Sequence, residues 1–135
     1  MANLTLLLVE DEPILQDLYS DRFQAAGATV LQATDGQQAI ELIDGHEEID
    51  IILLDLMLPK VSGYDVLVHI RQRRGHSIPV IIVSALADID DQARGLQLGA
   101  TDYITKGDLP PSEVVARIIA YMTPLAPENA LGTEG

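Results

Sequence analysis

The stretch 51–59 reads Ile51-Ile52-Leu53-Leu54-Asp55-Leu56-Met57-Leu58-Pro59 and carries the clearest fold signal in the chain. Its apolar residues do not alternate with polar ones, which is typical of a strand covered on both faces in the middle of a parallel sheet. The run is too short to span a membrane. Asp55 follows it directly, and ligands of open α/β sheets bind at the carboxyl ends of the strands. An isolated aspartate at such a point more often only begins a turn, so the other strand ends must decide whether Asp55 is functional.

Strands and helices alternate five times along the chain. Apolar runs predict strands at 4–9, 29–33, 50–54, 79–83 and 101–104. Helical patterns follow them, beginning near Pro13, Asp35, Ser62, Asp88 and Pro110. The first helix has one apolar stripe, made of Ile14, Leu15, Leu18, Tyr19 and Phe23. This order predicts an α/β fold: an open, doubly wound sheet of five parallel strands with five helices on its two faces.

The composition is that of one folded domain. The chain has 135 residues, of which 47% are hydrophobic, and this is enough for a single core. We expect the domain at 1–123. The segment 124–135 is rich in Pro, Ala, Gly and Glu without periodicity, and we expect a flexible tail or the start of a linker there.

Charge and cysteine content restrict the function further. The chain has no cysteine, which excludes disulfides and thiolate chemistry. Together with the lack of a membrane-length apolar segment, this favours the cytoplasm and argues against membrane association. The formal net charge is -13. Such a surface repels phosphate backbones, so we expect no direct nucleic-acid binding by this chain.

Polar residues stand at four of the five strand ends. Glu10 and Asp11 follow the first strand, Asp55 the third, Ser84 the fourth and Lys106 the fifth. Because carboxyl ends of parallel strands share one edge of a sheet, these side chains should converge. Three crowded carboxylates need a cation, and Mg²⁺ binds through carboxylate oxygens and phosphate. Asp55 is then a candidate nucleophile that forms an acyl phosphate, with Ser84 and Lys106 bonded to the phosphoryl oxygens.

Four motifs in order, each ending an apolar run, resemble the receiver domain of two-component response regulators. The motifs are Leu8-Val9-Glu10-Asp11-Glu12, Leu54-Asp55-Leu56-Met57-Leu58-Pro59, Val83-Ser84-Ala85 and Tyr103-Ile104-Thr105-Lys106. The resemblance covers about 4–122. It implies a flavodoxin-like fold with strand order 2-1-3-4-5. It also implies a phosphorylation-dependent signalling switch and not an enzyme, with at most Mg²⁺-dependent self-phosphorylation and self-dephosphorylation.

The resemblance implies a role for each site residue. Asp55 matches the phosphoacceptor. Glu10 and Asp11 match the acidic pair that holds Mg²⁺ together with Asp55, and the main-chain carbonyl of Met57 matches the remaining protein ligand.

Three further residues match the family's switch pair and its conserved lysine. Ser84 matches the switch hydroxyl, for which many members have threonine, and Lys106 matches the lysine that contacts the phosphoryl group. Tyr103 matches the aromatic residue that turns inward when the switch residue moves. The sequence departs from the family at Gly107, because proline usually follows the lysine, often after a cis peptide bond. We expect the Lys106–Gly107 bond to be trans, because a cis bond before a residue other than proline costs about 2.5–4 kcal/mol.

The resemblance also implies partners. The phosphoryl donor would be a phosphohistidine on a sensor histidine kinase or phosphotransfer protein. A downstream protein, or an output domain absent from this chain, would respond. We expect the response to use the surface formed by the helix at 88–98, the strand at 101–104 and the last helix, through which a homodimer could also form. Charged residues in these segments include Asp88, Asp91, Arg94, Asp102, Glu113 and Arg117.

Two alternatives remain open from the sequence. One is a protein-interaction module with the same fold that is never phosphorylated. The other is a small Mg²⁺-dependent phosphatase with Asp55 as nucleophile, although Met57 stands where such enzymes often have a second aspartate. Dinucleotide, ATP and serine-hydrolase functions lack support, because the sequence has no GxGxxG, P-loop or G-x-S-x-G motif.

Overall fold

A five-stranded parallel sheet runs through the middle of the domain, with its strands in the order β2-β1-β3-β4-β5. The computed structural model describes residues 4–122, so the segment predicted to be a tail lies outside the described residues. The elements are β1 (Thr5–Val9), α1 (Pro13–Ala25), β2 (Thr29–Ala33), α2 (Gly36–Gly45), β3 (Ile49–Leu54), α3 (Gly63–Arg74), β4 (Val80–Ser84), α4 (Ile89–Gln97), β5 (Asp102–Thr105) and α5 (Pro111–Met122). The predicted fold class, element order and strand order are confirmed.

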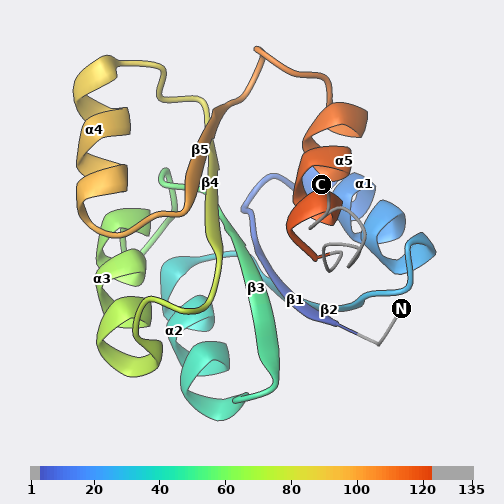
Figure 1. Ribbon diagram of the computed structural model, residues 1–135, viewed down its shortest axis with the longest axis horizontal. Coiled ribbons are helices and arrows are strands. Elements are labelled where there is room, and N and C mark those ends of the chain that lie inside the picture. The colour runs from blue at the N-terminus through green and yellow to red at the C-terminus, as the bar shows by residue number, and fades with distance from the viewer. Residues whose placement is uncertain (1–3, 123–135) are drawn as a thin grey trace, which may run out of the picture.

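The five helices form two layers, one on each face of the sheet (Figure 1). Helices α1 and α5 cover one face, and α2, α3 and α4 cover the other. Side chains of a strand alternate between the faces, so Leu6 and Leu8 pack under α1 and α5, whereas Leu7 and Val9 pack under α2 and α3. Within residues 4–122, no helix is both long and apolar enough to cross a membrane.

The helices begin at the signals that the sequence contains. Pro13 occupies the first turn of α1, where its missing N–H leaves no hydrogen bond unmade. The side chain of Ser62 accepts a hydrogen bond from the N–H of Asp65 and caps α3. One prediction for α1 was wrong: Ile14 is 82% exposed and lies outside the buried stripe. The stripe is centred on Tyr19 and Phe23, which are buried, and a helix can turn only one arc of its surface towards the sheet.

The loop after β3 packs closely against the backbone of two glycines, Gly36 and Gly63. A Cβ on Gly63 would lie 2.4 Å from the carbonyl oxygen of Asp55, and one on Gly36 would lie 2.0 Å from that of Val61. The N–H of Gly63 also donates to the carbonyl of Leu56 at 3.0 Å. The backbone that carries Asp55 is therefore fixed by the first turns of α2 and α3, where only glycine fits without a shift.

Candidate functional site

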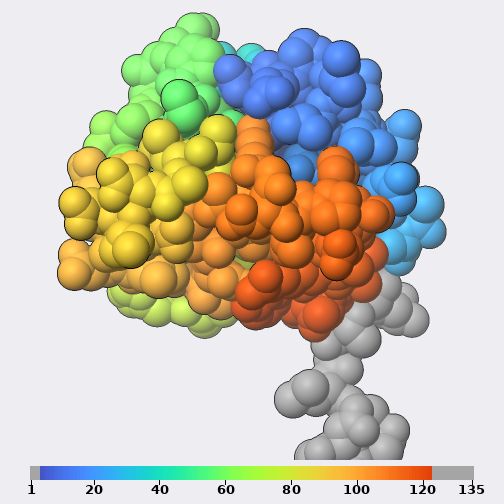
Figure 2. Space-filling view, turned by 90° about the horizontal axis from the view of Figure 1, so that it is seen from above, coloured from blue at the N-terminus to red at the C-terminus, as the bar shows by residue number. Residues whose placement is uncertain are grey.

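The predicted site residues meet at the carboxyl edge of the sheet. The segments that follow β1, β3, β4 and β5 adjoin one another on a single face of the molecule, in dark blue, green, yellow and orange (Figure 2). Strand alternation decides which side chains point the same way. Glu10, Asp55 and Lys106 continue the series of Leu8, Leu53 and Ile104, which all pack under α1 and α5.

Lys106, which follows β5, forms ion pairs with side chains that follow β1 and β3. Its Nζ lies 2.9 Å from Glu10 Oε1, 3.0 Å from Asp55 Oδ2 and 3.1 Å from Glu12 Oε2. Asp55 is buried, and its Oδ1 accepts a hydrogen bond from the N–H of Met57 at 3.1 Å. One ammonium group therefore faces the buried nucleophile candidate and two further carboxylates.

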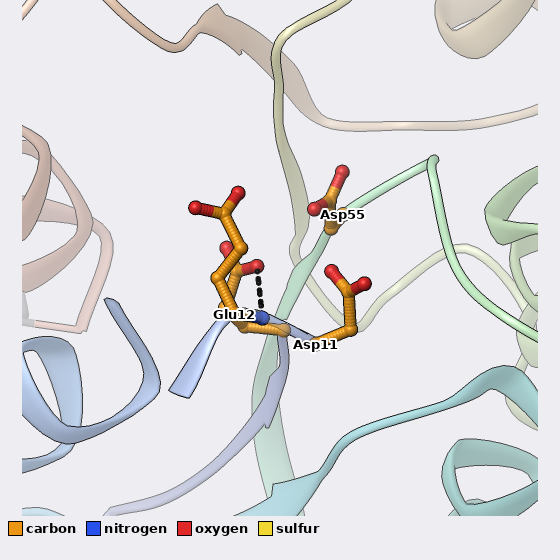
Figure 3. A group of neighbouring side chains, drawn as sticks. Asp11, Glu12 and Asp55 are labelled. Carbon is orange, nitrogen blue, oxygen red and sulfur yellow. Dashed lines mark hydrogen bonds between the residues drawn. The ribbon is translucent and has the colours of Figure 1, made fainter. Parts of the chain in front are cut away.

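Four carboxylates form one group around this position. Glu10, Asp11, Glu12 and Asp55 each offer an oxygen atom, and these atoms all lie within 4.8 Å of one another. Figure 3 shows Asp11 and Glu12 on the turn after β1 and Asp55 at the end of β3. The dashed line marks the bond from the N–H of Glu12 to Glu10 Oε2, 3.1 Å long. Sequence reasoning assigned no role to Glu12, although it directly extends the acidic pair.

The electrostatics of the group are unfavourable without a cation. Glu10 is fully buried, and burial, with the nearby charge of Asp55, raises its pKa to about 7 against the hydrogen bonds from Lys106 and Glu12. Burial by itself would lower the pKa of Lys106, but its contacts with Glu10 and Asp55 outweigh that effect and raise it. Lys106 therefore stays charged, and Glu10 takes up a proton near neutral pH to relieve the excess of negative charge.

The two switch candidates lie towards the other face of the sheet and share one neighbour. Ser84 is fully buried at the end of β4, and its hydroxyl accepts a hydrogen bond from the N–H of Leu86 at 3.3 Å. Tyr103 is half-buried against Gly95 of α4 and donates its hydroxyl hydrogen to the carbonyl of Leu86 at 2.7 Å. Burial raises the pKa of Tyr103 to about 12, so the hydroxyl keeps its hydrogen at neutral pH. Both side chains thus hold the peptide backbone between β4 and α4.

The departure at Gly107 does not remove the lysine from the site. No peptide bond within residues 4–122 is cis, so the predicted trans bond between Lys106 and Gly107 is confirmed. Gly107 has a φ of 96°, a conformation that glycine adopts easily.

Several charged residues of the predicted response surface have partners within the chain. Arg94 lies 4.0 Å above the ring of Tyr64, and the hydroxyl of Tyr64 donates to Asp91 Oδ1 at 3.1 Å. On the neighbouring strand, Asp102 pairs with Arg117 at 3.3 Å and also accepts a hydrogen bond from Tyr121. These contacts connect α4 to α3 and β5 to α5.

Comparison with known proteins agrees with this geometry. A model of the response regulator receiver domain matches residues 6–119. The chain belongs to this family. The transcriptional regulatory protein CpxR of Escherichia coli strain K12 is 41% identical over 117 residues, which are 87% of this chain and 48% of that protein. The chain spans about half the length of the curated relatives it matches.

Two solved receiver domains illustrate the structural similarity. The receiver domain of the Francisella response regulator 1452 has a TM-score of 0.78 and 30% identity over 87% of this chain and 95% of that chain. The receiver domain of the sensor histidine kinase PA1611 from Pseudomonas aeruginosa PAO1 has a TM-score of 0.76 and 32% identity over 89% of this chain and 97% of that chain. That structure has a magnesium ion coordinated in its active site cleft. The present chain is thus a receiver domain of two-component signalling, a phosphorylation-dependent switch, and no finding favours the alternative of an interaction module that is never phosphorylated.

Proposed function

We propose that Asp55 accepts the phosphoryl group from a phosphohistidine of a sensor kinase or phosphotransfer protein. The P–N bond of the donor breaks and a P–O bond to an Asp55 carboxylate oxygen forms, which gives an acyl phosphate. The observation that supports this most is the 3.0 Å distance between Lys106 Nζ and Asp55 Oδ2. An ammonium group at that distance can pair with the oxygens of a phosphoryl group on the same carboxylate.

The donor set around Asp55 fits Mg²⁺. Glu10, Asp11 and Asp55 offer carboxylate oxygens within one small volume, and the main chain of Met57 follows Asp55 by two residues. We assign these four as the residues that hold the ion, directly or through water, because Mg²⁺ prefers oxygen ligands. When bound, the ion neutralises charge on the transferring phosphoryl group. Lys106 supplies only one positive charge to this group of carboxylates, so a bound cation would balance the remaining negative charge without protonation of Glu10.

The switch then follows from the contacts of Leu86. Phosphorylation adds about 1.5 to 2 negative charges and three acceptor oxygens at Asp55. The Ser84 hydroxyl no longer accepts the hydrogen bond from the N–H of Leu86. It donates a hydrogen bond to a phosphoryl oxygen instead. This loosens the same residue that Tyr103 holds through its hydroxyl. The equilibrium between two positions of the loop before α4 shifts, and the hydrogen bond between the Tyr103 hydroxyl and the carbonyl of Leu86 changes with it.

Exposed apolar side chains around the site support docking of a protein donor. Ile14 is 82% exposed and Met57 is 55% exposed. A hollow of about 550 Å³ between α1 and the start of α5 is lined by Leu15, Leu109 and Pro110 among others, with Glu12 and Lys106 also in its wall. Ile14→Ser should slow phosphotransfer from a sensor kinase and leave phosphorylation by acetyl phosphate unchanged. Equal slowing with both donors would contradict a docking role for Ile14.

The downstream partner is proposed to recognise the surface formed by α4, β5 and α5. This partner is a separate protein, or an output domain joined to the receiver domain in the same chain. The relatives are about twice as long as the segment matched here, which is enough for such a domain. Self-association through the same surface stays a prediction. Sedimentation of the domain with and without the phosphoryl mimic beryllofluoride tests it, and an unchanged monomer in both conditions would contradict it.

The experiment on Asp55 itself is intact-mass spectrometry. After incubation with acetyl phosphate and Mg²⁺, the protein should gain the mass of one phosphoryl group. Asp55→Asn and wild type in excess EDTA should gain none. A phosphoryl group on Asp55→Asn, or no gain by the wild type with any donor, would overturn the proposal.

The chain is proposed to be an acceptor and not a phosphatase. With p-nitrophenyl phosphate in excess, release of product should be no faster than self-phosphorylation and self-dephosphorylation of Asp55, which are slow. Rapid release of many equivalents, lost in Asp55→Asn, would favour the phosphatase alternative.

A further inference from the structure

Glu12 is the only exposed carboxylate among the three that contact Lys106. Its side chain is 59% exposed, whereas those of Glu10 and Asp55 are buried. A lysine ammonium has three N–H donors, and three carboxylates are placed around it here. Because Glu10 and Asp55 are enclosed by the sheet and its loops, Glu12 is the partner that can leave without a large rearrangement.

Glu12 directly precedes α1, but its side chain does not serve that helix. It occupies the N-cap position, where Ser, Thr, Asp and Asn are preferred because their short side chains cap the helix. The Glu12 side chain makes no capping hydrogen bond. Its main-chain N–H is fixed by Glu10 Oε2 at 3.1 Å, and Pro13 follows. The backbone is therefore held, while the carboxylate is free to turn about its side-chain bonds.

The same carboxylate lies beside one positive charge and within the group of carboxylates that could hold another. It is 3.1 Å from Lys106 Nζ, and it also belongs to the group of four carboxylates whose oxygen atoms approach one another within 4.8 Å. We infer that Glu12 is an exchangeable carboxylate: it pairs with Lys106 in the metal-free domain and turns towards the divalent cation, or its water shell, when the cation binds. This inference rests on the proposed function, since it assumes the cation site.

The exchange has a consequence for the phosphorylated state. When Glu12 turns to the cation, one N–H donor of Lys106 is released at the moment when Asp55 is ready to receive a phosphoryl group. The released donor can then bond to a phosphoryl oxygen. Glu12 in this description is a positioning residue, because it acts on the acceptor site through Lys106 and the cation and does not touch the reacting atoms.

The test is a set of Mg²⁺ titrations of the metal-free domain, with binding measured by NMR at constant pH and ionic strength. Glu12→Gln removes the charge and keeps the shape, and Glu41→Gln, at an exposed position of α2, is the matched control. A unit charge near a divalent ion in a mostly aqueous site predicts about fivefold weaker Mg²⁺ binding in Glu12→Gln, with Glu41→Gln within about 1.5-fold of wild type. In the metal-free domain, the Lys106 Nζ resonance should shift in Glu12→Gln only.

A second pair of titrations, in the Lys106→Met background, separates direct from indirect action. If Glu12 exchanges to the cation, Glu12→Gln still weakens binding about fivefold or more there, because Glu12 no longer has to leave Lys106. If Glu12 acts only by neutralising Lys106, its effect disappears in that background and the inference is wrong. Lys106→Gln replaces Lys106→Met if circular dichroism shows that the latter does not fold. Equal affinity of wild type and Glu12→Gln overturns the exchange alone, whereas no Mg²⁺ binding by wild type overturns the proposed cation site.

Discussion

Replacing Gly63 with alanine should destabilise the domain and disturb Asp55 together. The added Cβ would lie 2.4 Å from the carbonyl oxygen of Asp55 and 2.4 Å from the Cα of Leu56. Both are backbone atoms, so neither can swing aside as the end of a side chain would. Overpacking of this kind costs typically 1–3 kcal/mol. With an unfolding entropy of roughly 2.1 cal/mol/K per residue, taken over the residues 4–122 that the structure describes, the melting temperature should fall by roughly 4–12 °C.

Thermal and urea unfolding followed by circular dichroism measure this effect, and Gly45→Ala is the matched control. A Cβ on Gly45, the last residue of α2, would have no neighbour within 4 Å. That variant should be neutral or gain up to about 1 kcal/mol, because alanine loses less backbone entropy on folding. Gly63→Ala should also accept phosphate from acetyl phosphate more slowly, since the shift displaces the Asp55 backbone. A Gly63→Ala melting temperature within about 1 °C of wild type would refute the close contact on which this argument depends.

Three further outcomes are expected. In a double-mutant cycle of Tyr64→Leu and Arg94→Gln, urea unfolding should give a coupling energy of about 0.5–1 kcal/mol for the cation above the ring, and strict additivity would contradict that contact. In EDTA, the raised pKa of Glu10, about 7 against an ordinary 4.5, means that the folded domain binds this proton more tightly than the unfolded chain. Its contribution to stability is then complete below about pH 4.5 and lost as pH rises through 7, on the order of 3 kcal/mol. Urea midpoints should therefore fall from pH 5 to 8, and Glu10→Gln should flatten this slope, whereas equal slopes would show that the source is elsewhere. The hydrogen bond from His69 lowers the pKa of Asp44 below its ordinary 3.8, so the stabilisation it gives is present above that pH and lost as pH falls further. An NMR titration midpoint of Asp44 at or above 3.8 would contradict this.

The sequence by itself determined the fold and most of the candidate site. Short apolar runs without alternation, separated by helical patterns, favour strands covered on both faces, and helices between them make the sheet parallel. Parallel strands end at one edge, so residues as distant in sequence as Glu10, Asp55 and Lys106 had to come close. That these three also share a face is shown by the packing of Leu8, Leu53 and Ile104, each two residues earlier in the chain, under α1 and α5.

Only the tertiary structure decided how elements are placed against one another. Helical spacing did not reveal that Ile14 is exposed, because the rotation of α1 depends on how it packs on the sheet. The contact of Gly63 with the Asp55 carbonyl and the pairing of Glu12 with Lys106 join atoms from separate elements. Periodicity states which way a side chain points from its own strand or helix. It does not state the distance between two elements, and hydrogen bonds and ion pairs depend on differences of less than 1 Å in that distance.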